Sequence, residues 1–263
     1  EPLADYAQRQ IVDVMVGRAL APRELRHREV DRSGTPALAF DNVGTNLGHR
    51  DITFEVYPGE VVGLYGLVGA GRSELARSVI GLHRLTEGTL VLDGTPIQVH
   101  SVKDAVHRHG LGYLSEDRKG DGVFLDLTIR RNVAVTQWRR IRNWFGVPAS
   151  AETRIAERFI DSLGIRTRGA HQQVNELSGG NQQKVSVAKW LASDAKVLFI
   201  DEPTVGVDVR TKDELHHLVL DLADEGTAIV LISSDLPEMV ALADRIGIMN
   251  DFRLLDVVPN TKD

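Results

Sequence analysis

The sequence predicts an α/β domain with a parallel core sheet, a small antiparallel β layer and a helical subdomain. Apolar β-prone segments alternate with helical segments through the second half of the chain, which is typical of a parallel sheet covered by helices. The early β-prone segments have no helices between them, which indicates the antiparallel layer. A glycine-rich loop and a pair of acids each follow an apolar strand directly.

Composition limits the classes of protein to consider. The chain has 263 residues, of which 42% are hydrophobic, so it can form one large domain. It carries 31 basic and 37 acidic residues, and the net charge of −6 argues against a nucleic-acid-binding protein. Because there is no cysteine, disulfides and thiolate metal sites are excluded. No apolar run reaches the roughly 18 residues needed to span a bilayer.

The N-terminal region, residues 1–34, is expected to be a helix and a linker ahead of the main domain, residues 35–263. Apolar residues in Ala4–Leu20 have approximately helical spacing. The arginine-rich segment that follows, which includes Arg28 and Arg32, is expected to be solvated.

The elements of the main domain are predicted from runs of β-prone residues and from helical periodicity. The expected strands are Ala37–Phe40, Ile52–Val56, Glu60–Leu64, Thr89–Leu92, Ile97–His100, Leu111–Leu114, Val197–Ile200, Ala228–Ile232 and Arg245–Met249. The expected helices are Ser73–Ile80, Thr128–Val135, Glu152–Leu163, Asn181–Ala192, Lys212–Ala223 and Pro237–Ala243. The helical subdomain is expected around Glu116–Glu176.

Residues 66–73, GLVGAGRS, have the spacing of a phosphate-binding loop between a strand and a helix. Glycines let consecutive backbone N–H groups point at a phosphate, and the helix N-terminus adds further donors. Arg72 stands where a lysine is expected, and its planar guanidinium binds phosphate with a different geometry. Taken alone, the loop could also be a glycine-rich turn without a ligand. The residues expected to bind the nucleotide are Gly66, Gly69, Ala70, Gly71, Arg72, Ser73 and Glu74.

The strand Val197–Ile200 leads into Asp201 and Glu202, at the strand end where parallel sheets bind ligands. Asp201 is expected to hold Mg²⁺ together with the hydroxyl of Ser73, and Glu202 is expected to polarise the attacking water. The alternative is a strand that simply ends in a charged turn.

The segment LSGGNQQK, residues 177–184, places a serine and two glycines at the start of a predicted helix. With this segment ahead of Asp201, and with Val205–Asp208 behind it, the sequence resembles the ATPases of ABC transporters from Pro36 to Met249. The resemblance implies that Ser178, Gly179 and Gly180 are the signature motif, which closes over the phosphate loop of a second nucleotide-binding domain. Val205–Asp208 resembles the D-loop of the family. ATP and Mg²⁺ are the implied cofactors.

A narrower resemblance, to the second half of fused ribose, galactose and xylose importer ATPases, rests on four segments. They are Gly69–Leu75, Ser115–Lys119, the signature with Asn181–Lys184, and Ser233–Asp235. Ile11–Arg18 resembles the tail of an upstream half, which agrees with a start at Glu1. The implied partners are the other nucleotide-binding half, a membrane permease and, indirectly, a periplasmic sugar-binding protein. The implied location is the cytoplasmic face of the bacterial inner membrane.

Four departures from that family predict a weak or slowly hydrolysing site on this half. Besides Arg72, Glu116 replaces the lid glutamine, where it is expected to face the metal. Ser234 replaces the switch histidine, and Gly44–Arg50 offers no aromatic residue to stack on adenine. The same departures fit a non-catalytic regulatory module. A soluble ABC-type ATPase of DNA repair or translation is the other alternative, and the net charge argues against it.

The segment from Trp138 to Trp144 interleaves two tryptophans with Arg139, Arg140 and Arg142. This pattern could stack on nucleic-acid bases, but ordinary packing beside a basic face is favoured. No nucleic-acid partner is therefore expected.

Overall fold

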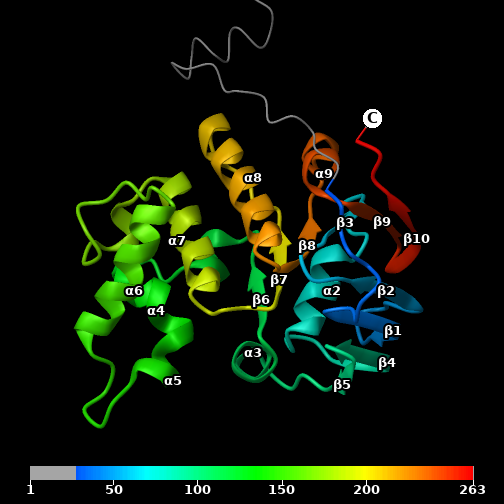
Figure 1. Cartoon of the computed structure of the whole chain (residues 1–263), viewed down its shortest axis with the longest axis horizontal. Coiled ribbons are helices and arrows are strands. Elements are labelled where there is room, and N and C mark those ends of the chain that lie inside the picture. Colours follow the sequence, from blue (N-terminus) through cyan, green and yellow to red (C-terminus); the bar gives the residue numbers. More distant parts are fainter. Residues whose placement is uncertain (1–27, 263) are drawn as a thin grey trace, which may run out of the picture.

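The computed structural model describes residues 28–262, so the predicted helix Ala4–Leu20 lies outside the described residues. The centre is a six-stranded sheet in the order β10-β9-β3-β8-β7-β6, parallel except for β10 at its edge (Figure 1). Its strands are β3 (Val61–Gly66), β6 (Leu111–Leu114), β7 (Val197–Asp201), β8 (Ala228–Ile232), β9 (Arg245–Asn250) and β10 (Arg253–Pro259). The predicted fold class, with its parallel core sheet, is confirmed.

The inner strands of the core sheet are largely buried, because helices or the second sheet cover both of its faces. Every residue of β7 and β8 is buried, and both strands are apolar except for Asp201 at the end of β7. Strand β10 was not predicted. It contains half-buried and exposed residues and no fully buried one, which fits an edge strand.

The second layer is an antiparallel sheet in the order β2-β1-β4-β5. Its strands are β1 (Leu38–Thr45), β2 (Ile52–Val56), β4 (Leu85–Leu92) and β5 (Thr95–Ile97). The predicted strand Ile97–His100 is wrong in its bounds. Asp93 and Gly94 both have positive φ and form a tight turn, so that Leu92 pairs directly with Thr95 and pairing ends at Ile97.

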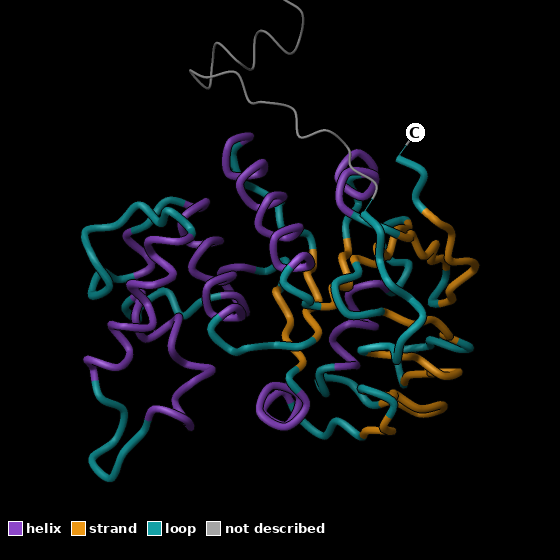
Figure 2. Tube along the Cα trace, viewed as in Figure 1, coloured by secondary structure: helices purple, strands orange, loops and turns teal. Residues whose placement is uncertain are grey.

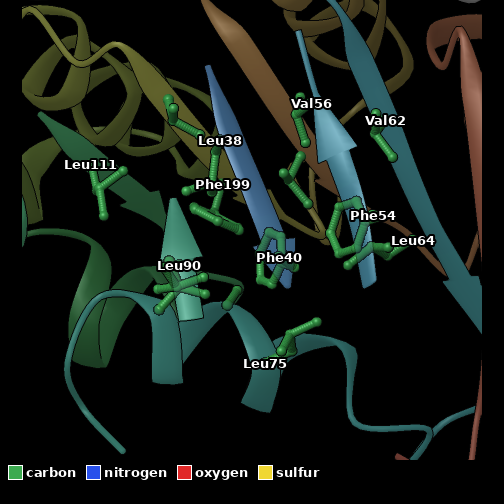
Figure 3. Close-up of a cluster of buried hydrophobic side chains, with 14 of the residues drawn as sticks. Leu38, Phe40, Phe54, Val56, Val62, Leu64, Leu75, Leu90, Leu111 and Phe199 are labelled. Carbon is green, nitrogen blue, oxygen red and sulfur yellow. The ribbon is translucent and has the colours of Figure 1, made fainter. Parts of the chain in front are cut away.

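A hydrophobic core joins the two sheets and the helix α2 (Arg72–Val79). Figure 3 shows Phe40 and Phe54 of the antiparallel layer beside Leu64 of β3 and Leu75 of α2. The rings of Phe40 and Phe54 stack with their centroids 4.2 Å apart. This packing fixes the antiparallel layer against the helix that follows the glycine-rich loop.

Helices cover the other face of the core sheet and form a lobe to one side (Figure 2). The helices after α2 are α3 (Val102–Asp104), α4 (Ile129–Ala134), α5 (Trp138–Ile141), α6 (Ala149–Ser162), α7 (Gly179–Leu191), α8 (Val209–Asp224) and α9 (Leu236–Leu242). The lobe has its own core, which extends past Glu176 to Val185, Ala188 and Ala192 of α7 and its C-cap. Between residues 28 and 262, no helix is long and apolar enough to cross a membrane.

The described part of the arginine-rich linker is docked on the domain. Arg28 forms ion pairs with Asp224 and Asp244 and donates to the Gly59 carbonyl. Arg32 pairs with Glu60, which is fully buried, at 2.6 Å. The expectation that this segment is merely solvated is therefore wrong for Arg28 and Arg32, because their charges stabilise the buried carboxylates of Asp244 and Glu60.

Candidate nucleotide-binding site

The glycine-rich loop connects the end of β3 at Gly66 to the start of α2 at Arg72. Gly69 and Gly71 have φ values of 84° and 92°, which L side chains rarely adopt. The Ala70 amide donates to the Leu67 carbonyl at 3.0 Å and closes the turn. The loop therefore has the tight geometry that brings backbone amides and a helix N-terminus to one place, as phosphate binding requires.

His49 holds this loop from the antiparallel layer and was not predicted to do so. Its Nε2 lies 2.8 Å from the Gly71 carbonyl and its Nδ1 lies 2.6 Å from the hydroxyl of Thr45. Burial lowers the pKa of His49. In the neutral ring Nε2 donates to the carbonyl, which can only accept, and Nδ1 accepts from Thr45.

His49 also lies in the segment Gly44–Arg50, where the family resemblance implies an aromatic residue for adenine. Its ring is fully buried and meets Phe252 edge to face, with the centroids 4.9 Å apart. The imidazole therefore packs inside the domain and presents no exposed face to a base.

Arg72 does not extend from the loop into solvent. Its side chain is 9% exposed, and Nη1 donates to the Ser233 carbonyl at 2.9 Å. The same guanidinium lies 3.9 Å from Glu202. No local sequence pattern predicts burial of Arg72, whereas the structure buries it between the phosphate loop and the ends of β7 and β8.

Asp201 and Ser73 are brought together across 128 residues of sequence. The Ser73 hydroxyl donates to Asp201 at 3.0 Å, and the Tyr113 hydroxyl donates to the other carboxylate oxygen at 2.6 Å. Burial raises the pKa of Asp201, although both hydrogen bonds lower it. A fully buried carboxylate beside a serine hydroxyl, at the mouth of a phosphate loop, is a donor set that fits Mg²⁺.

Tyr113 is a site residue that sequence reasoning missed. It lies on the predicted strand β6, and Arg77 of α2 donates to its hydroxyl at 3.2 Å. Burial and the neighbouring Asp201 raise the pKa of Tyr113. The phenol therefore remains a hydrogen-bond donor toward the carboxylate. No local sequence signal marks it, because only the pairing of β6 with β7 brings it to Asp201.

Glu116 follows β6 in an exposed position and does not complete a metal-binding cluster. Its charge is close enough to raise the pKa of Asp201. In the described part of the chain, no three His, Asp or Glu side chains gather into a group that could hold a metal ion. Ser73 and Asp201 would therefore be the protein ligands with the best geometry.

Glu202 has a strained backbone, with φ at 46° in the left-handed region. Its amide donates to the Ile232 carbonyl, which fixes the turn after β7 against the end of β8. Burial raises the pKa of Glu202, while hydrogen bonds from Ser234 and the charge of Arg72 lower it. The carboxylate is thus held at the strand end, in contact with Arg72 and Ser234, two of the residues at which the sequence differs from the expected family pattern.

The residues expected to form the signature motif, Ser178, Gly179 and Gly180, lie on a different surface. Ser178 is the exposed N-cap of α7, Gly179 and Gly180 form its first turn, and Asn181 donates to the Ser178 hydroxyl at 2.8 Å. A Cβ on Gly180 would lie 2.7 Å from the hydroxyl of Thr211, so only glycine allows α7 to approach α8 this closely. Figure 1 shows α7 and α2 on opposite sides of β6 and β7. This chain therefore does not close its own signature over its own phosphate loop.

The sequence profile of the ABC transporter family matches residues 49–205, more than half of the chain and the whole span from His49 to the acids after β7. The chain belongs to the ABC transporter family. In this ABC domain the glycine-rich loop at residues 66–73, the segment at residues 177–184 and the acids Asp201 and Glu202 all lie within the matched residues.

Several curated proteins are similar to this ABC domain over nearly its whole length. The ribose import ATP-binding protein RbsA of Shouchella clausii is 38% identical over 97% of this chain and 51% of its own. RbsA 3 of Rubrobacter xylanophilus is 41% identical over 98% and 51%. A putative ribose/galactose/methyl galactoside import ATP-binding protein of Burkholderia lata is 41% identical over 96% and 49%. The chain thus spans about half the length of the curated relatives it matches.

Solved structures support the fold. A nucleotide-free ATP-binding cassette from an ABC transporter superposes with a TM-score of 0.72 at 17% identity, covering 86% of this chain and 92% of that one. A dimeric ATP-binding cassette bound to ADP and Pi also gives 0.72, at 21% identity, covering 84% and 98%. At these identities the likeness concerns the ABC ATPase architecture.

Proposed function

We propose that this chain is an ATP-binding cassette of an ABC importer for sugars of the ribose and galactose type. Relatives named for ribose or galactoside import are similar to it over almost all of its length. Their length, about twice that of the match, supports the assignment of this chain to one half of a fused pair. The resemblance of Gly69–Leu75, Ser115–Lys119 and Ser233–Asp235 favours the second half.

The nucleotide site on this chain would bind Mg-ATP through the loop amides, Ser73 and Asp201. Magnesium, when bound, would neutralise charge on the β- and γ-phosphates. Glu202 would orient and polarise a water molecule for attack on the γ-phosphate. Tyr113 would keep Asp201 ionised and oriented, since its hydrogen bond favours the carboxylate.

We further infer that hydrolysis at this site is slow, and the position of Arg72 carries this inference. The guanidinium engages the Ser233 carbonyl and lies 3.9 Å from Glu202. To bind phosphate, the Arg72 guanidinium would have to lie beside the phosphates. Here it is hydrogen-bonded to the Ser233 carbonyl and lies near Glu202, the proposed general base. Ser234 in place of the switch histidine and Glu116 in place of the lid glutamine also support slow hydrolysis at this site.

The intact signature gives this cassette a role at the other site of a dimer. Ser178 is exposed at the N-terminus of a 13-residue helix, where N–H groups and the helix dipole favour an anion. In this role Ser178, Gly179 and Gly180 would complete the site on the phosphate loop of the partner cassette. The cassette would dock on permease subunits at the cytoplasmic face of the inner membrane, and a periplasmic sugar-binding protein would act through the permease.

The test compares two variants in the assembled transporter. Ser178→Arg should abolish ATP hydrolysis and sugar transport, because it blocks closure and removes stabilisation of the γ-phosphate in the partner site. Arg72→Ala should leave a substantial fraction of transport, because the site it alters contributes little hydrolysis. Equal amounts of assembled complex are the control. If Arg72→Ala is as inactive as Ser178→Arg, the site on this chain is catalytic and the division of roles is wrong.

The chain without its partner supplies a second test. It should be monomeric, bind Mg-ATP weakly and hydrolyse it hardly at all, because closure requires the partner cassette. A small thermal shift at millimolar Mg-ATP is expected, since stabilisation grows with the ratio of ligand concentration to Kd. Turnover comparable to that of an assembled transporter would contradict this.

A further inference from the structure

Glu238 of α9 is a buried carboxylate outside the catalytic set described above. It is 1% exposed, yet no lysine or arginine pairs with it among the contacts of the described residues. Three neutral or weakly basic groups surround it. The Thr204 hydroxyl donates to Oε1 at 2.9 Å, the Ser233 hydroxyl donates to Oε2 at 2.6 Å, and His216 Nε2 lies 2.7 Å from Oε1.

These donors make Glu238 a carboxylate whose partners come from three other segments. Burial alone would raise the pKa of Glu238, but the hydrogen bonds from His216, Ser233 and Thr204 outweigh it and hold that pKa below its usual value. A buried carboxylate that keeps its charge interacts strongly with each donor, so displacing one donor affects the others.

The partners of Glu238 belong to segments with separate roles. Thr204 directly precedes the D-loop, Val205–Asp208, which leads into α8. Ser233 follows β8, and its backbone carbonyl accepts the hydrogen bond from Arg72 of the phosphate loop. A continuous set of contacts therefore runs from Arg72 through Ser233 and Glu238 to Thr204.

A second contact joins the same two segments. Lys212 in the first turn of α8 donates to Asp235, whose other carboxylate oxygen caps α9 by accepting from the Glu238 amide at 3.2 Å. The Asp235 amide in turn donates to the Ser233 hydroxyl at 3.1 Å. The D-loop region and the segment Ser233–Asp235 are thus connected on both sides of Glu238.

We propose that Glu238 is a positioning residue that couples the phosphate loop of this cassette to its D-loop. If the proposed function is right, occupation of this site then changes the D-loop that faces the partner cassette. In this way, nucleotide bound at a slowly hydrolysing site would influence the nucleotide site of the partner cassette. Contact alone does not establish energetic coupling, so the test must measure one segment while the other is altered.

The experiment is backbone hydrogen exchange on this chain without nucleotide. Thr204→Val removes one donor and keeps the shape of the side chain. Amides of Val205–Asp208 should exchange about fivefold faster, the change expected from one hydrogen bond. Amides of Ser233–Asp235, 29 or more residues away in sequence, should also exchange faster, and Thr204→Ser should restore both segments.

Ser233→Ala tests the coupling from the other end and should accelerate exchange in Val205–Asp208. The double variant should show less than the sum of the two effects, because both act through one carboxylate. Glu214→Gln on α8, which lies outside this set of contacts, is the matched control and should leave both segments unchanged. If each variant changes only its own segment, Glu238 does not couple them and the proposal is overturned.

Addition of Mg-ATP separates this proposal from the proposed function. In the unaltered chain, Mg-ATP should change protection in Val205–Asp208, and Thr204→Val should lose that response while its affinity by calorimetry stays within about twofold. If calorimetry detects no Mg-ATP binding, the proposed function fails and the nucleotide-free exchange data still decide the coupling. If Mg-ATP binds without any change in the D-loop of the unaltered chain, the coupling proposal fails alone.

Discussion

The guanidinium of Arg72 donates to the backbone carbonyl of Ser233 at 2.9 Å and thereby ties the start of α2 to the end of β8. Arg72, the only cation in the phosphate loop, is thus buried inside the domain and does not point toward a nucleotide. Nucleotide binding through Arg72 would require breaking this contact, which gives a physical reason for a weak site.

Arg72→Met should lower the free energy of unfolding by about 1–3 kcal/mol, because it leaves the Ser233 carbonyl buried without this donor. Urea denaturation measures the effect. Arg84→Met, at an exposed position, is the control and should change stability by less than about 0.5 kcal/mol. Equal effects of the two variants would mean that the Arg72 contact contributes nothing to the fold.

Two glycines of the phosphate loop should differ in their tolerance of alanine. Both have positive φ, so each substitution costs about 1–2 kcal/mol of backbone strain. A Cβ on Gly69 meets nothing within 4 Å, whereas one on Gly71 would lie 2.7 Å from Phe252 and 2.8 Å from His49 Nε2. Gly71→Ala should therefore destabilise the domain clearly more than Gly69→Ala, as measured by denaturant unfolding. Similar losses would argue against the tight packing of His49 and Phe252 on the loop.

Lys189 should make stability depend on pH in the alkaline range. Its ammonium is buried and donates to the Gly122 carbonyl at 2.6 Å, and burial lowers its pKa to about 8. Between pH 8 and the unfolded value of 10.5, the unfolded chain binds more protons than the folded chain. The contribution of Lys189 to stability therefore rises with pH across this window, by up to about 3 kcal/mol.

The measurement compares the unaltered chain with Lys189→Met in urea at pH 7 and pH 10. The stability difference should shift in favour of the unaltered chain as pH rises. Lys103→Met, at an exposed lysine, should give no such shift. A pH-independent difference at Lys189 would show that its pKa is close to the ordinary value.

Trp144 and Phe145 should contribute to binding and not to folding. Both side chains are 95% exposed at the tip of a turn closed by Asn143 and Gly146. Ordinary packing was expected for this region. Trp138 does pack on the domain and donates to Glu152 at 2.9 Å, but Trp144 and Phe145 do not. Exposed aromatics beside arginines are common anchors of protein interfaces.

Replacement of both aromatics by serine should leave the free energy of unfolding within about 0.5 kcal/mol. It should also reduce recovery of the cassette with permease-containing membranes. Trp190→Ala is the contrasting variant and should cost about 3–5 kcal/mol, because Trp190 is 8% exposed in the core. Unchanged membrane recovery of the double serine variant would exclude this turn from the permease contact.

The glycine-rich loop, the acid pair and the serine-glycine segment could be predicted from the sequence, because each combines a local backbone requirement with a local apolar pattern. Glycines at residues 66, 69 and 71, the apolar strand before Asp201, and the serine before the two glycines of α7 needed no knowledge of distant contacts. The parallel sheet followed from the alternation of strands and helices, since strand ends then align at one edge.

The side chains that contact these motifs are determined by tertiary packing and could not be predicted from the sequence. His49 reaches Gly71, Tyr113 reaches Asp201, and Glu238 joins Thr204 to Ser233 across separate segments. Such contacts depend on sheet order and side-chain direction, which no local pattern encodes.

Arg72 combines both kinds of information. The sequence by itself determined that an arginine stands in the phosphate loop where a lysine is expected, and that the domain is an ABC-type α/β fold. Only the tertiary structure decided that this arginine is buried against Ser233 and Glu202, because the direction of a long side chain depends on what the fold packs around it.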